Sequence, residues 1–190
     1  MRLMRLVSVV LWSLVGLAAA PTPSYVREQP EDGARPTTAG GVYGHVRRVT
    51  GAMRRDAALA EVILRRLYEL QPNLDERMAY DIALETARWS RNTGVRWRLL
   101  VAIMWHESRF DPNAVSRTND HGLFQLHARP IYGIGENIRQ GSAHIAGCLA
   151  AANGNERMAL AAYNGGPGGW RIGRCRAYAD SVLSLCGASE

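Results

Sequence analysis

Apolar residues recur at helical spacing through most of the chain after residue 53, and no stretch alternates convincingly between apolar and polar positions. In the first helical segment the apolar positions lie three or four residues apart: Leu59, Val62, Ile63, Leu67 and Leu70. Gln71-Pro72 ends this predicted helix. The pattern therefore predicts a mainly α domain with few or no short strands.

A second helix is predicted from Leu74 to about Arg91, ending near Gly94. Asn73 is its expected N-cap, because Glu76 stands three residues later in the position of a capping box. Residues 51–92 contain no pattern that suggests chemistry, so we interpret them as a helical scaffold segment.

The third predicted helix runs from about Val95 to Glu107 and is apolar. Ile103 and Glu107 fall on the same side as Leu99, so Glu107 continues a buried face. A carboxyl group in apolar surroundings has its charged form disfavoured, so the pKa of Glu107 should rise. A carboxyl group that is still protonated near neutral pH can serve as a general acid.

After Glu107 the helical pattern gives way to turns before it resumes. Asp111-Pro112 has the form of an N-cap followed by proline at the first helical position. Residues 116–122 predict a polar loop, and Gly133 to Gly141 predicts another irregular stretch. Further helices are expected over residues 139–152, 157–163 and 176–185. The glycine-rich run 164–169 predicts a tight, exposed turn.

The N-terminus predicts export. Arg2 and Arg5 precede an apolar run from Leu6 to Leu17, which is shorter than the roughly 20 residues of a membrane span. We place cleavage after Ala18, with an uncleaved membrane anchor as the alternative. The proline-containing residues 21–50 predict a flexible linker. The expected organisation is a signal peptide (1–20), the linker (21–50), the scaffold segment (51–92) and a catalytic domain (93–187).

Composition and charge narrow the choice of partner. Apolar residues make up 47% and charged residues 21%, as in a globular domain, and the formal net charge of +6 suits an anionic polymer. The arginines are scattered without a dense tract, so we expect no nucleic-acid binding. Export permits disulfides, and Cys148 is expected to pair with Cys175 or Cys186, with three buried thiols as the alternative.

Several mechanisms are excluded by the residues that are missing. His106-Glu107 begins like a zinc-protease motif, but Phe110 occupies the position of the second histidine. The chain has neither a phosphate-binding glycine loop followed by lysine nor a Gly-x-Ser-x-Gly turn. We therefore expect neither a metal nor a cofactor.

The remaining lone carboxylate suits cleavage of a glycosidic bond, which needs a proton for the leaving oxygen. Asp111 has the pattern of a cap and Asp120 lies in a loop, so the sequence does not place a second carboxylate. One carboxylate suffices if an N-acetyl group of the substrate stabilises the cation. The same Glu107 can then deprotonate an internal sugar hydroxyl.

Five motifs in order over about 90 residues resemble the soluble-lytic-transglycosylase-type (SLT) catalytic domain of peptidoglycan-cleaving enzymes, a relative of the goose-type lysozyme fold. The motifs are Glu107-Ser108, Asp111-Pro112-Asn113-Ala114-Val115-Ser116, Gly122-Leu123-Phe124-Gln125, Asn137-Ile138 with Gly141, and Ala162-Tyr163-Asn164-Gly165-Gly166-Pro167. Two departures are that Phe124 stands where Met is common and that His127-Ala128-Arg129-Pro130 replaces the usual Pro-x-Thr-Ala turn.

The resemblance implies a lysozyme-like helical fold with Glu107 as the general acid and base. It implies that Ser116 and Gln125 contact the N-acetylmuramoyl sugar, that Tyr163 faces Glu107 and the sugar, and that Asn164 supports the groove. Ser108 is a further substrate-binding candidate, with a hydrogen bond at the helix end as its alternative role.

The leading hypothesis is a lytic transglycosylase that cuts the β-1,4 bond between N-acetylmuramic acid and N-acetylglucosamine and leaves a 1,6-anhydro-muramoyl product. The alternatives are a lysozyme-type hydrolase of the same bond, with Asp120 as the second group, and a non-catalytic peptidoglycan-binding component of a secretion or pilus system. We expect a monomer in the periplasm or cell envelope, acting on peptidoglycan glycan strands and serving a secretion, conjugation or pilus assembly complex.

Overall fold

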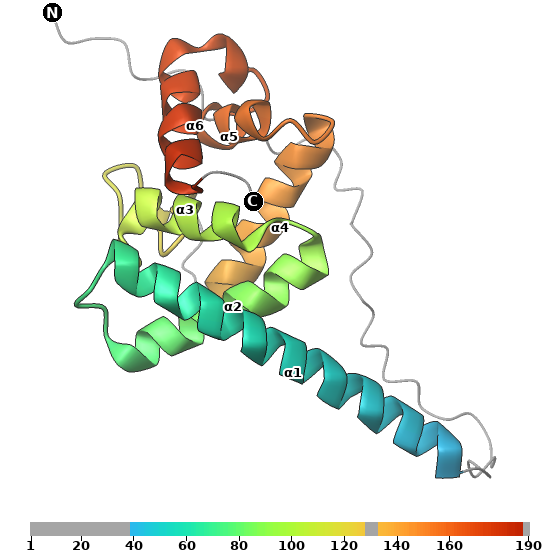
Figure 1. Ribbon diagram of the computed structural model, residues 1–190. Coiled ribbons are helices and arrows are strands. Elements are labelled where there is room, and N and C mark those ends of the chain that lie inside the picture. The colour runs from blue at the N-terminus through green and yellow to red at the C-terminus, as the bar shows by residue number, and fades with distance from the viewer. Residues whose placement is uncertain (1–38, 128–132, 188–190) are drawn as a thin grey trace, which may run out of the picture. The chain divides into compact units, whose positions relative to one another are not determined.

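The computed structural model describes residues 39–127 and 133–187 (Figure 1). The predicted signal peptide and residues 21–38 of the predicted linker lie outside the described residues, so the export signal and the domain boundaries stay predictions. None of the described helices is both long enough and apolar enough to cross a membrane.

Helices dominate the described residues, which confirms the mainly α prediction. The elements in chain order are α1 (Ala39–Leu70), α2 (Glu76–Thr93), α3 (Trp97–Ser108), β1 (Asp120–His121), β2 (Leu126–His127), α4 (Ile134–Ala151), α5 (Glu156–Gly165), the 3-10 helix η1 (Gly169–Arg171) and α6 (Gly173–Leu185). The two short strands form one antiparallel hairpin, in which Asp120 pairs with His127 and His121 with Leu126.

Some helices begin and end where the sequence predicts, and others do not. The backbone of α1 is helical from Ala39, well before the periodic pattern that begins near Met53. The N-cap of α2 is Asp75 rather than Asn73, because the Asp75 Oδ1 accepts the Met78 N–H at 2.9 Å. The predicted end of α2 at Gly94 is confirmed: Gly94 has a φ of 73° and its N–H donates to the Ser90 carbonyl.

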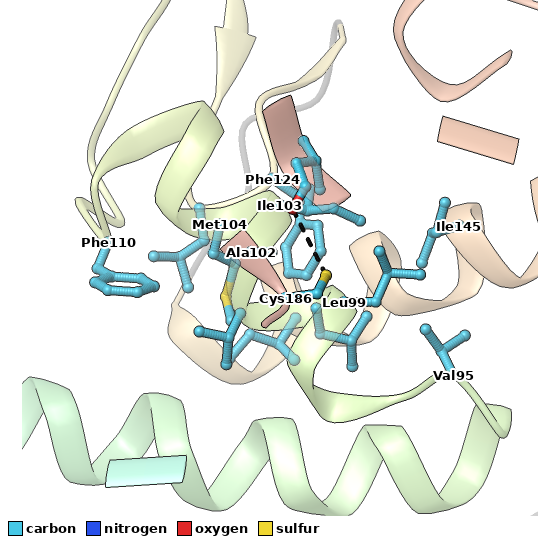
Figure 2. Close-up of a cluster of buried hydrophobic side chains, with 14 of the residues drawn as sticks. Val95, Leu99, Ala102, Ile103, Met104, Phe110, Phe124, Ile145 and Cys186 are labelled. Carbon is cyan, nitrogen blue, oxygen red and sulfur yellow. Dashed lines mark hydrogen bonds between the residues drawn. The ribbon is translucent and has the colours of Figure 1, made fainter. Parts of the chain in front are cut away.

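Helix α3 lies in the middle of the core. Its six consecutive residues Leu99–Met104 are all 1% exposed or less, as expected of a helix surrounded on all sides. It packs against α2 and α6. Figure 2 shows side chains of α3 clustered with Phe110, Phe124 and Ile145, which come from three other parts of the chain. This packing fixes the helix that carries Glu107.

The C-terminal half of α1 covers part of this core with Ile63 and Leu67, which are fully buried. Val62, another of the periodic apolar positions, is 43% exposed and lies outside the buried face of α1. An ion pair between Arg91 and Asp56, with both nitrogen–oxygen distances 2.8 Å, also joins α1 to α2. These contacts attach α1 to the core, and the scaffold role of this segment stays a prediction.

The structure corrects the irregular stretch expected from Gly133 to Gly141, because α4 begins at Ile134. Asn137 lies in its first turn, 1% exposed, and its Oδ1 accepts the Phe124 N–H at 3.2 Å. A Cβ atom on Gly141 would lie 2.2 Å from the Phe124 ring. The residues that suggested a loop are therefore explained by the contact between α4 and Phe124.

Asp111-Pro112 begins a turn and not a helix, which corrects the predicted N-cap. The Asp111 Oδ1 accepts the Asn113 N–H at 2.8 Å, and its carbonyl accepts the Ala114 N–H at 3.3 Å. This is a side-chain-stabilised turn of the kind that Asp favours. Asp111 therefore has a structural role, as predicted, but it stabilises a turn and does not cap a helix.

The expected disulfide between Cys148 and another cysteine is also wrong, because all three thiols are free and buried. Each sulfur occupies its own packing site. The Cys175 Sγ lies 2.4 Å from where a Cβ on Gly165 would be, and the Cys186 Sγ lies 3.6 Å from the Val182 carbonyl oxygen. The alternative of three buried thiols is the one that the structure adopts.

The turn within the glycine-rich run 164–169 is shorter than predicted. Gly165 still belongs to α5 and Gly169 begins η1, which leaves residues 166–168 between them. Gly169 is buried, and a Cβ atom on it would lie 1.9 Å from the Ala161 carbonyl oxygen. The run therefore serves close packing of η1 on α5 as well as the turn.

Candidate active site

Glu107 lies in the last turn of α3, at the end of the buried helix. Arg109 ends this helix with a φ of 56°, and Phe110 follows with a φ of 64°. These two left-handed residues return the chain sharply to the core, where the buried Phe110 ring packs 5.4 Å from the ring of Trp105. The position of Glu107 is thus fixed from both sides.

The environment of Glu107 favours its protonated form. Burial raises the pKa of Glu107 from 4.5 to about 7, a hydrogen bond from Tyr178 lowers it in part, and the negative charge of Asp120 raises it. The C-terminal end of a helix also disfavours negative charge. The raised pKa expected from the apolar helix face is confirmed, so a substantial fraction of Glu107 carries a proton at neutral pH.

Tyr178 on α6 is the direct partner of Glu107. Its hydroxyl donates to the Glu107 Oε1 at 2.6 Å across a sequence separation of 71 residues. The ring is 8% exposed, and burial, followed by the charge of Glu107, raises the pKa of Tyr178 well above 10, so it stays a donor. No sequence motif pointed to this residue; the i, i+4 spacing of Tyr178 and Val182 is the one signal that could have placed it on a buried helix face.

Tyr163 on α5 lies beside this pair but does not contact Glu107 through its hydroxyl. The hydroxyl donates to the Phe124 carbonyl at 2.6 Å, and the ring stacks on Tyr178 with centroids 6.4 Å apart. Burial, followed by the negative charge of Glu107, raises the pKa of Tyr163 well above 10. Tyr163 thus belongs to the site, holding the strand-bearing loop in place.

Two histidines border the tyrosines. The His106 ring meets Tyr178 edge-on at 4.8 Å, and the His144 ring lies 5.0 Å from Tyr163. Burial, with the charge of Arg109 as a second cause, lowers the pKa of His106, and burial lowers that of His144. Both rings are therefore neutral near pH 7, and they add no positive charge that would favour ionised Glu107.

Ser108 joins α3 to the loop that contains β1 and β2. Its Oγ lies 3.0 Å from the carbonyl oxygens of both Met104 and Leu123, so its one proton is shared between them. This is the helix-end hydrogen bond considered above as its alternative role. Together with the Tyr163 bond to Phe124, it fixes residues 123–124 against the end of α3.

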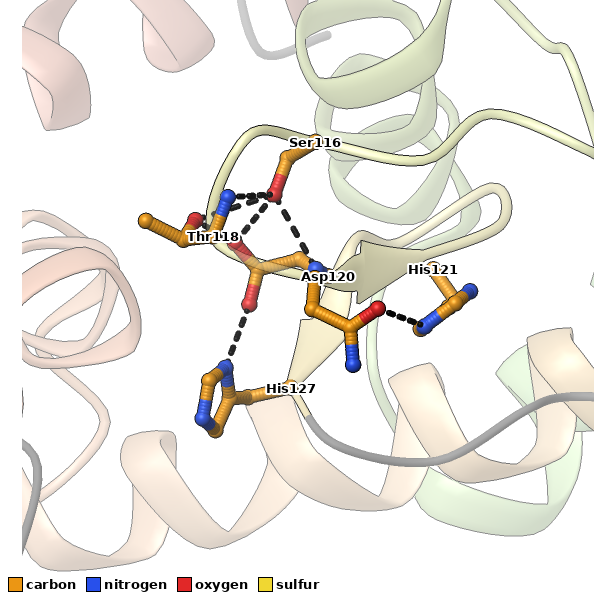
Figure 3. A network of polar contacts seen from close by, with 6 residues as sticks. Ser116, Thr118, Asp120, His121 and His127 are labelled. Atoms are coloured by element: carbon orange, nitrogen blue, oxygen red, sulfur yellow. Dashed lines mark hydrogen bonds and ion pairs between the residues drawn. The ribbon is translucent and has the colours of Figure 1, made fainter.

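Ser116 and Asp120 form a polar network within this loop (Figure 3). The Ser116 hydroxyl donates to the Asp120 Oδ2 at 2.7 Å and accepts the N–H groups of Thr118 and Asp120 at 3.1 and 3.0 Å. A serine hydroxyl offers one donor and two acceptor positions, so these bonds use all of them. Ser116 braces the loop here, and its contact with a sugar stays a prediction.

Asp120 has a partner at each carboxylate oxygen. Thr118 donates to Oδ2 alongside Ser116, and the His127 Nδ1 lies 2.8 Å from Oδ1. Burial raises the pKa of Asp120, but the hydrogen bonds from Thr118, Ser116 and His127 together outweigh it, so the pKa is lowered overall. Asp120 is therefore ionised wherever Glu107 is functional as an acid.

Gln125 follows the network with a left-handed φ of 45°. Its Nε2 donates to the carbonyls of Ala114 and Gly122 at 3.1 and 2.9 Å, which uses both amide hydrogens and orients the amide. Its Oε1 has no partner among the described residues. This oxygen can accept a hydroxyl or N–H group from a sugar, as the predicted role requires.

Asn164 is exposed at the end of α5, directly after Tyr163, and makes no side-chain hydrogen bond to any described residue.

An open cavity of about 640 Å³ lies away from these residues and is lined by residues 94–98 together with Ser90 and Glu156. These residues surround the start of α3, about 15 Å along the helix from Glu107. The cavity is not part of the candidate active site.

The site therefore combines one carboxyl group that is protonated near pH 7 with one carboxylate that is ionised. Pairs of carboxyl groups with separated pKa values are typical of sites that transfer protons to glycosidic oxygens. Tyr178 orients the first group, and the loop network holds the second. Of the predicted residues, Glu107 and Tyr163 both contact Tyr178, the first through a hydrogen bond and the second through ring stacking. Ser108, Ser116 and Gln125 stabilise the adjacent loop.

The chain is similar to a known family of domains. A family model described as the transglycosylase SLT domain matches residues 86–180, half of the chain. Among solved structures, an inactive mutant of the lytic transglycosylase Slt from Pseudomonas aeruginosa is similar, with 26% identity and a TM-score of 0.48. That match covers 53% of this chain and 22% of the solved one, so the shared part is about a fifth of that protein. The family match and the mainly helical architecture confirm the predicted lysozyme-like helical fold, and the chain belongs to the transglycosylase SLT domain family.

Proposed function

We propose that this protein is a peptidoglycan lytic transglycosylase that cleaves the β-1,4 bond between N-acetylmuramic acid and N-acetylglucosamine. The observation that carries the proposal is Glu107 itself, held at the end of a buried helix by Tyr178, with its pKa raised to about 7. Membership of the SLT domain family supports the choice of peptidoglycan as the substrate.

In the first step Glu107 donates its proton to the glycosidic oxygen, and the bond from that oxygen to C1 of the muramoyl ring breaks. Because Tyr178 occupies the Glu107 Oε1, the second carboxyl oxygen is the one left for the substrate. The N-acetyl group of the muramoyl sugar stabilises the positive charge at C1. Nothing in this step needs a metal or a second protein nucleophile.

In the second step the C6 hydroxyl of the same sugar attacks C1 and gives its proton to ionised Glu107. The product is a 1,6-anhydro ring, Glu107 returns to its protonated state, and no water is consumed. A pKa near 7 suits a group that first gives and then takes a proton at neutral pH. Gln125 would accept a hydrogen bond from the muramoyl sugar through its Oε1.

The nature of the product tests the proposal. Purified peptidoglycan is digested with protein that starts at Ala19, and the fragments are identified by mass spectrometry. We expect anhydro-muropeptides. Reducing-end products would instead establish a hydrolase of the same bond, the alternative that the ionised Asp120 favours. Peptidoglycan binding without any products would establish a binding component.

The location of the protein is part of the same proposal. Export through residues 1–20 would bring it to the periplasm or cell envelope, where peptidoglycan lies, and a secretion, conjugation or pilus assembly complex would use its activity. N-terminal sequencing of the protein recovered from the cell envelope should begin at Ala19. An N-terminus at Met1 in the membrane fraction would establish the uncleaved anchor instead.

The Tyr178→Phe variant should shift the pH dependence upward. The hydrogen bond from Tyr178 stabilises ionised Glu107, so removing it raises the pKa of Glu107 further. We expect the basic limb of the kcat profile to move to higher pH, while kcat at the optimum falls by about 10-fold because Glu107 loses its orientation. Tyr80→Phe, at an exposed position on α2, is the matched control. A basic limb that stayed in place would contradict the role of Tyr178.

A further inference from the structure

Two consecutive residues of α3 contact Tyr178. Its hydroxyl donates to the Glu107 Oε1 at 2.6 Å, and its ring meets the His106 ring edge-on, with the centroids 4.8 Å apart and the planes at 77°. The proposed mechanism uses Glu107 and Tyr178 but gives no role to His106. The half-buried His106 side chain has no hydrogen bond to a described residue, so the ring contact with Tyr178 is its specific interaction with this part of the chain.

The geometry of this contact is a favourable one for two aromatic rings. Such rings prefer edge-to-face or offset arrangements with centroids about 4.5–7 Å apart, because the positive edge of one ring then meets the negative face of the other. The Tyr178 ring has a second neighbour in Tyr163, which lies nearly parallel to it, at 9° and 6.4 Å. The contact with His106 is the closer of the two, so His106 has the greater influence on the orientation of the Tyr178 ring.

The orientation of the Tyr178 ring determines where its hydroxyl points. The hydroxyl reaches Glu107 from α6, so a rotation of the ring away from its present orientation would lengthen or break the 2.6 Å bond. That bond lowers the pKa of Glu107 against the larger effect of burial. A residue that holds the ring can therefore act on the Glu107 proton without a hydrogen bond to Glu107.

We propose that His106 is a positioning residue of this active site: its ring holds Tyr178 in the orientation in which the tyrosine hydroxyl bonds to Glu107. The inference rests on the proposed function for its effect on the reaction. His106 takes no part in the proton transfers, which stay with Glu107, and the C6 hydroxyl still closes the anhydro ring.

The His106 ring is neutral near pH 7, so it acts through its shape and not through a charge. Burial, followed by the charge of Arg109, lowers the pKa of His106. The charged groups that act on the pair of His106 and Glu107 are Arg109 and the ionised Asp120. Because their pKa values are shifted by burial, the groups around the two tyrosines from the other helices are uncharged: Tyr163 of α5, and His144 and Cys148 of α4. An uncharged ring can therefore replace His106 without changing the charge near Glu107.

The test compares His106→Leu with His106→Phe. Both variants keep a bulky side chain, but only phenylalanine keeps an aromatic ring for the contact with Tyr178. In His106→Leu, kcat on purified peptidoglycan should fall by about 2- to 10-fold, as for the loss of one aromatic contact, and the basic limb of the pH profile should move to higher pH. His106→Phe should restore most of the native kcat and the native limb. Equal changes in the two variants would overturn the proposal.

Two measurements that need no turnover follow the contact itself. Carbon-13 NMR of labelled glutamate, with Glu107→Gln to assign the signal, reports the pKa of Glu107. This pKa should be higher in His106→Leu than in the native protein, because a weaker Tyr178 bond stabilises ionised Glu107 less. In a Tyr178→Phe background the same His106→Leu change should leave the Glu107 pKa in place, since its effect passes through the missing hydroxyl. Tyr80→Leu, which removes an exposed ring from α2, is the control.

The NMR outcomes separate this inference from the proposed function. A Glu107 pKa that rises in His106→Leu, and does not rise further when Tyr178→Phe is present, supports the inference even if the native protein releases no fragments. A lowered pKa would show that His106 mainly shields Glu107 from water, and an equal rise in both backgrounds would show that it acts on Glu107 directly. Either result overturns the inference, as does an unchanged pKa, even if the native protein releases anhydro-muropeptides and the proposed function stands.

Discussion

The Glu107→Gln variant is expected to lose glycan cleavage almost entirely, with kcat reduced by about 10³-fold or more. Glutamine keeps the size of the side chain and still accepts the Tyr178 hydrogen bond through its carbonyl oxygen. It cannot donate a proton to the leaving oxygen or take one from the C6 hydroxyl. Since general acid–base catalysis contributes about 10²- to 10⁴-fold and both steps use this residue, the loss should fall in the upper part of that range.

Initial rates of fragment release from purified peptidoglycan, measured with native and Glu107→Gln protein, provide the test. Glu61→Gln, at an exposed position on α1, controls for the change of charge. Binding of the variant to peptidoglycan should persist, because the loop residues that are expected to contact sugar are intact. A Glu107→Gln protein with more than about a tenth of the native kcat would show that another group supplies the proton.

The same variant should be more stable than the native protein at alkaline pH. Glu107 has a folded-state pKa raised from 4.5 to about 7, so the folded protein binds more protons than the unfolded chain between these values. Its free energy of unfolding therefore falls as the pH rises through this window, by up to about 3 kcal/mol. Glutamine removes that loss. Glu107→Gln should gain stability in urea denaturation at pH 8 and little at pH 4.

The pKa of Glu136 is shifted in the opposite direction from that of Glu107. A hydrogen bond from Arg139 is the main cause that lowers the pKa of Glu136 to about 2, so its ionised form stabilises the fold at pH values above the ordinary 4.5. The Glu136→Gln variant should therefore lose stability at pH 8 where Glu107→Gln gains it. Equal changes in the two variants would rule out the pKa explanation.

The part of the site that the sequence predicted is the part that local periodicity determines. Glu107 continues the face of Leu99 and Ile103, and a helix of ordinary geometry had to bring it into apolar surroundings. Its raised pKa followed from that one fact. The same reasoning located the ends of α1 and α2, since Gln71-Pro72 and Gly94 act on their own helices alone.

The part that sequence reasoning missed depends on contacts between distant segments. Tyr178 reaches Glu107 from 71 residues away, and no local pattern distinguishes it from Tyr163 as the hydrogen-bond partner. Asn137 and Gly141 were interpreted as loop residues, although in α4 the first holds the Phe124 N–H and the second makes room for its ring. The residue type at each of these positions is explained by its contact with Phe124 and not by its helix propensity.

The hydrogen bonds within the loop of residues 116–127 could not be predicted from the sequence either. The contact of Ser116 with a sugar stays a prediction, but its hydrogen bonds to Thr118 and Asp120 could not be foreseen from the sequence. The short spacing of these residues permits the network, but it does not require it, because many turns would fit the same polar run. The hairpin pairing of Asp120 with His127 selects one of them. That pairing is a property of the folded loop.

The Gly122→Ala variant should show how strongly this loop depends on one backbone position. Gly122 has a φ of +73°, and a Cβ atom there would lie 1.7 Å from the Asn137 Nδ2 and 3.3 Å from the Pro112 carbonyl oxygen. Asn137 is 1% exposed and cannot move aside without losing its bond to Phe124. The left-handed strain of about 1–2 kcal/mol and the overpacking of about 1–3 kcal/mol should together lower the free energy of unfolding by about 2–5 kcal/mol.

Gly94→Ala is the matched control, because Gly94 has the same φ of +73° and no heavy atom within 4 Å of the added Cβ. It should show the strain alone, about 1–2 kcal/mol in urea denaturation, and keep its native kcat. Gly122→Ala should in addition lose kcat, because the displaced loop moves Gln125 away from its expected contact with the sugar. Equal stability losses in the two variants would mean that Asn137 yields easily, and the loop would then be held by its hydrogen bonds and not by the packing of Gly122 on α4.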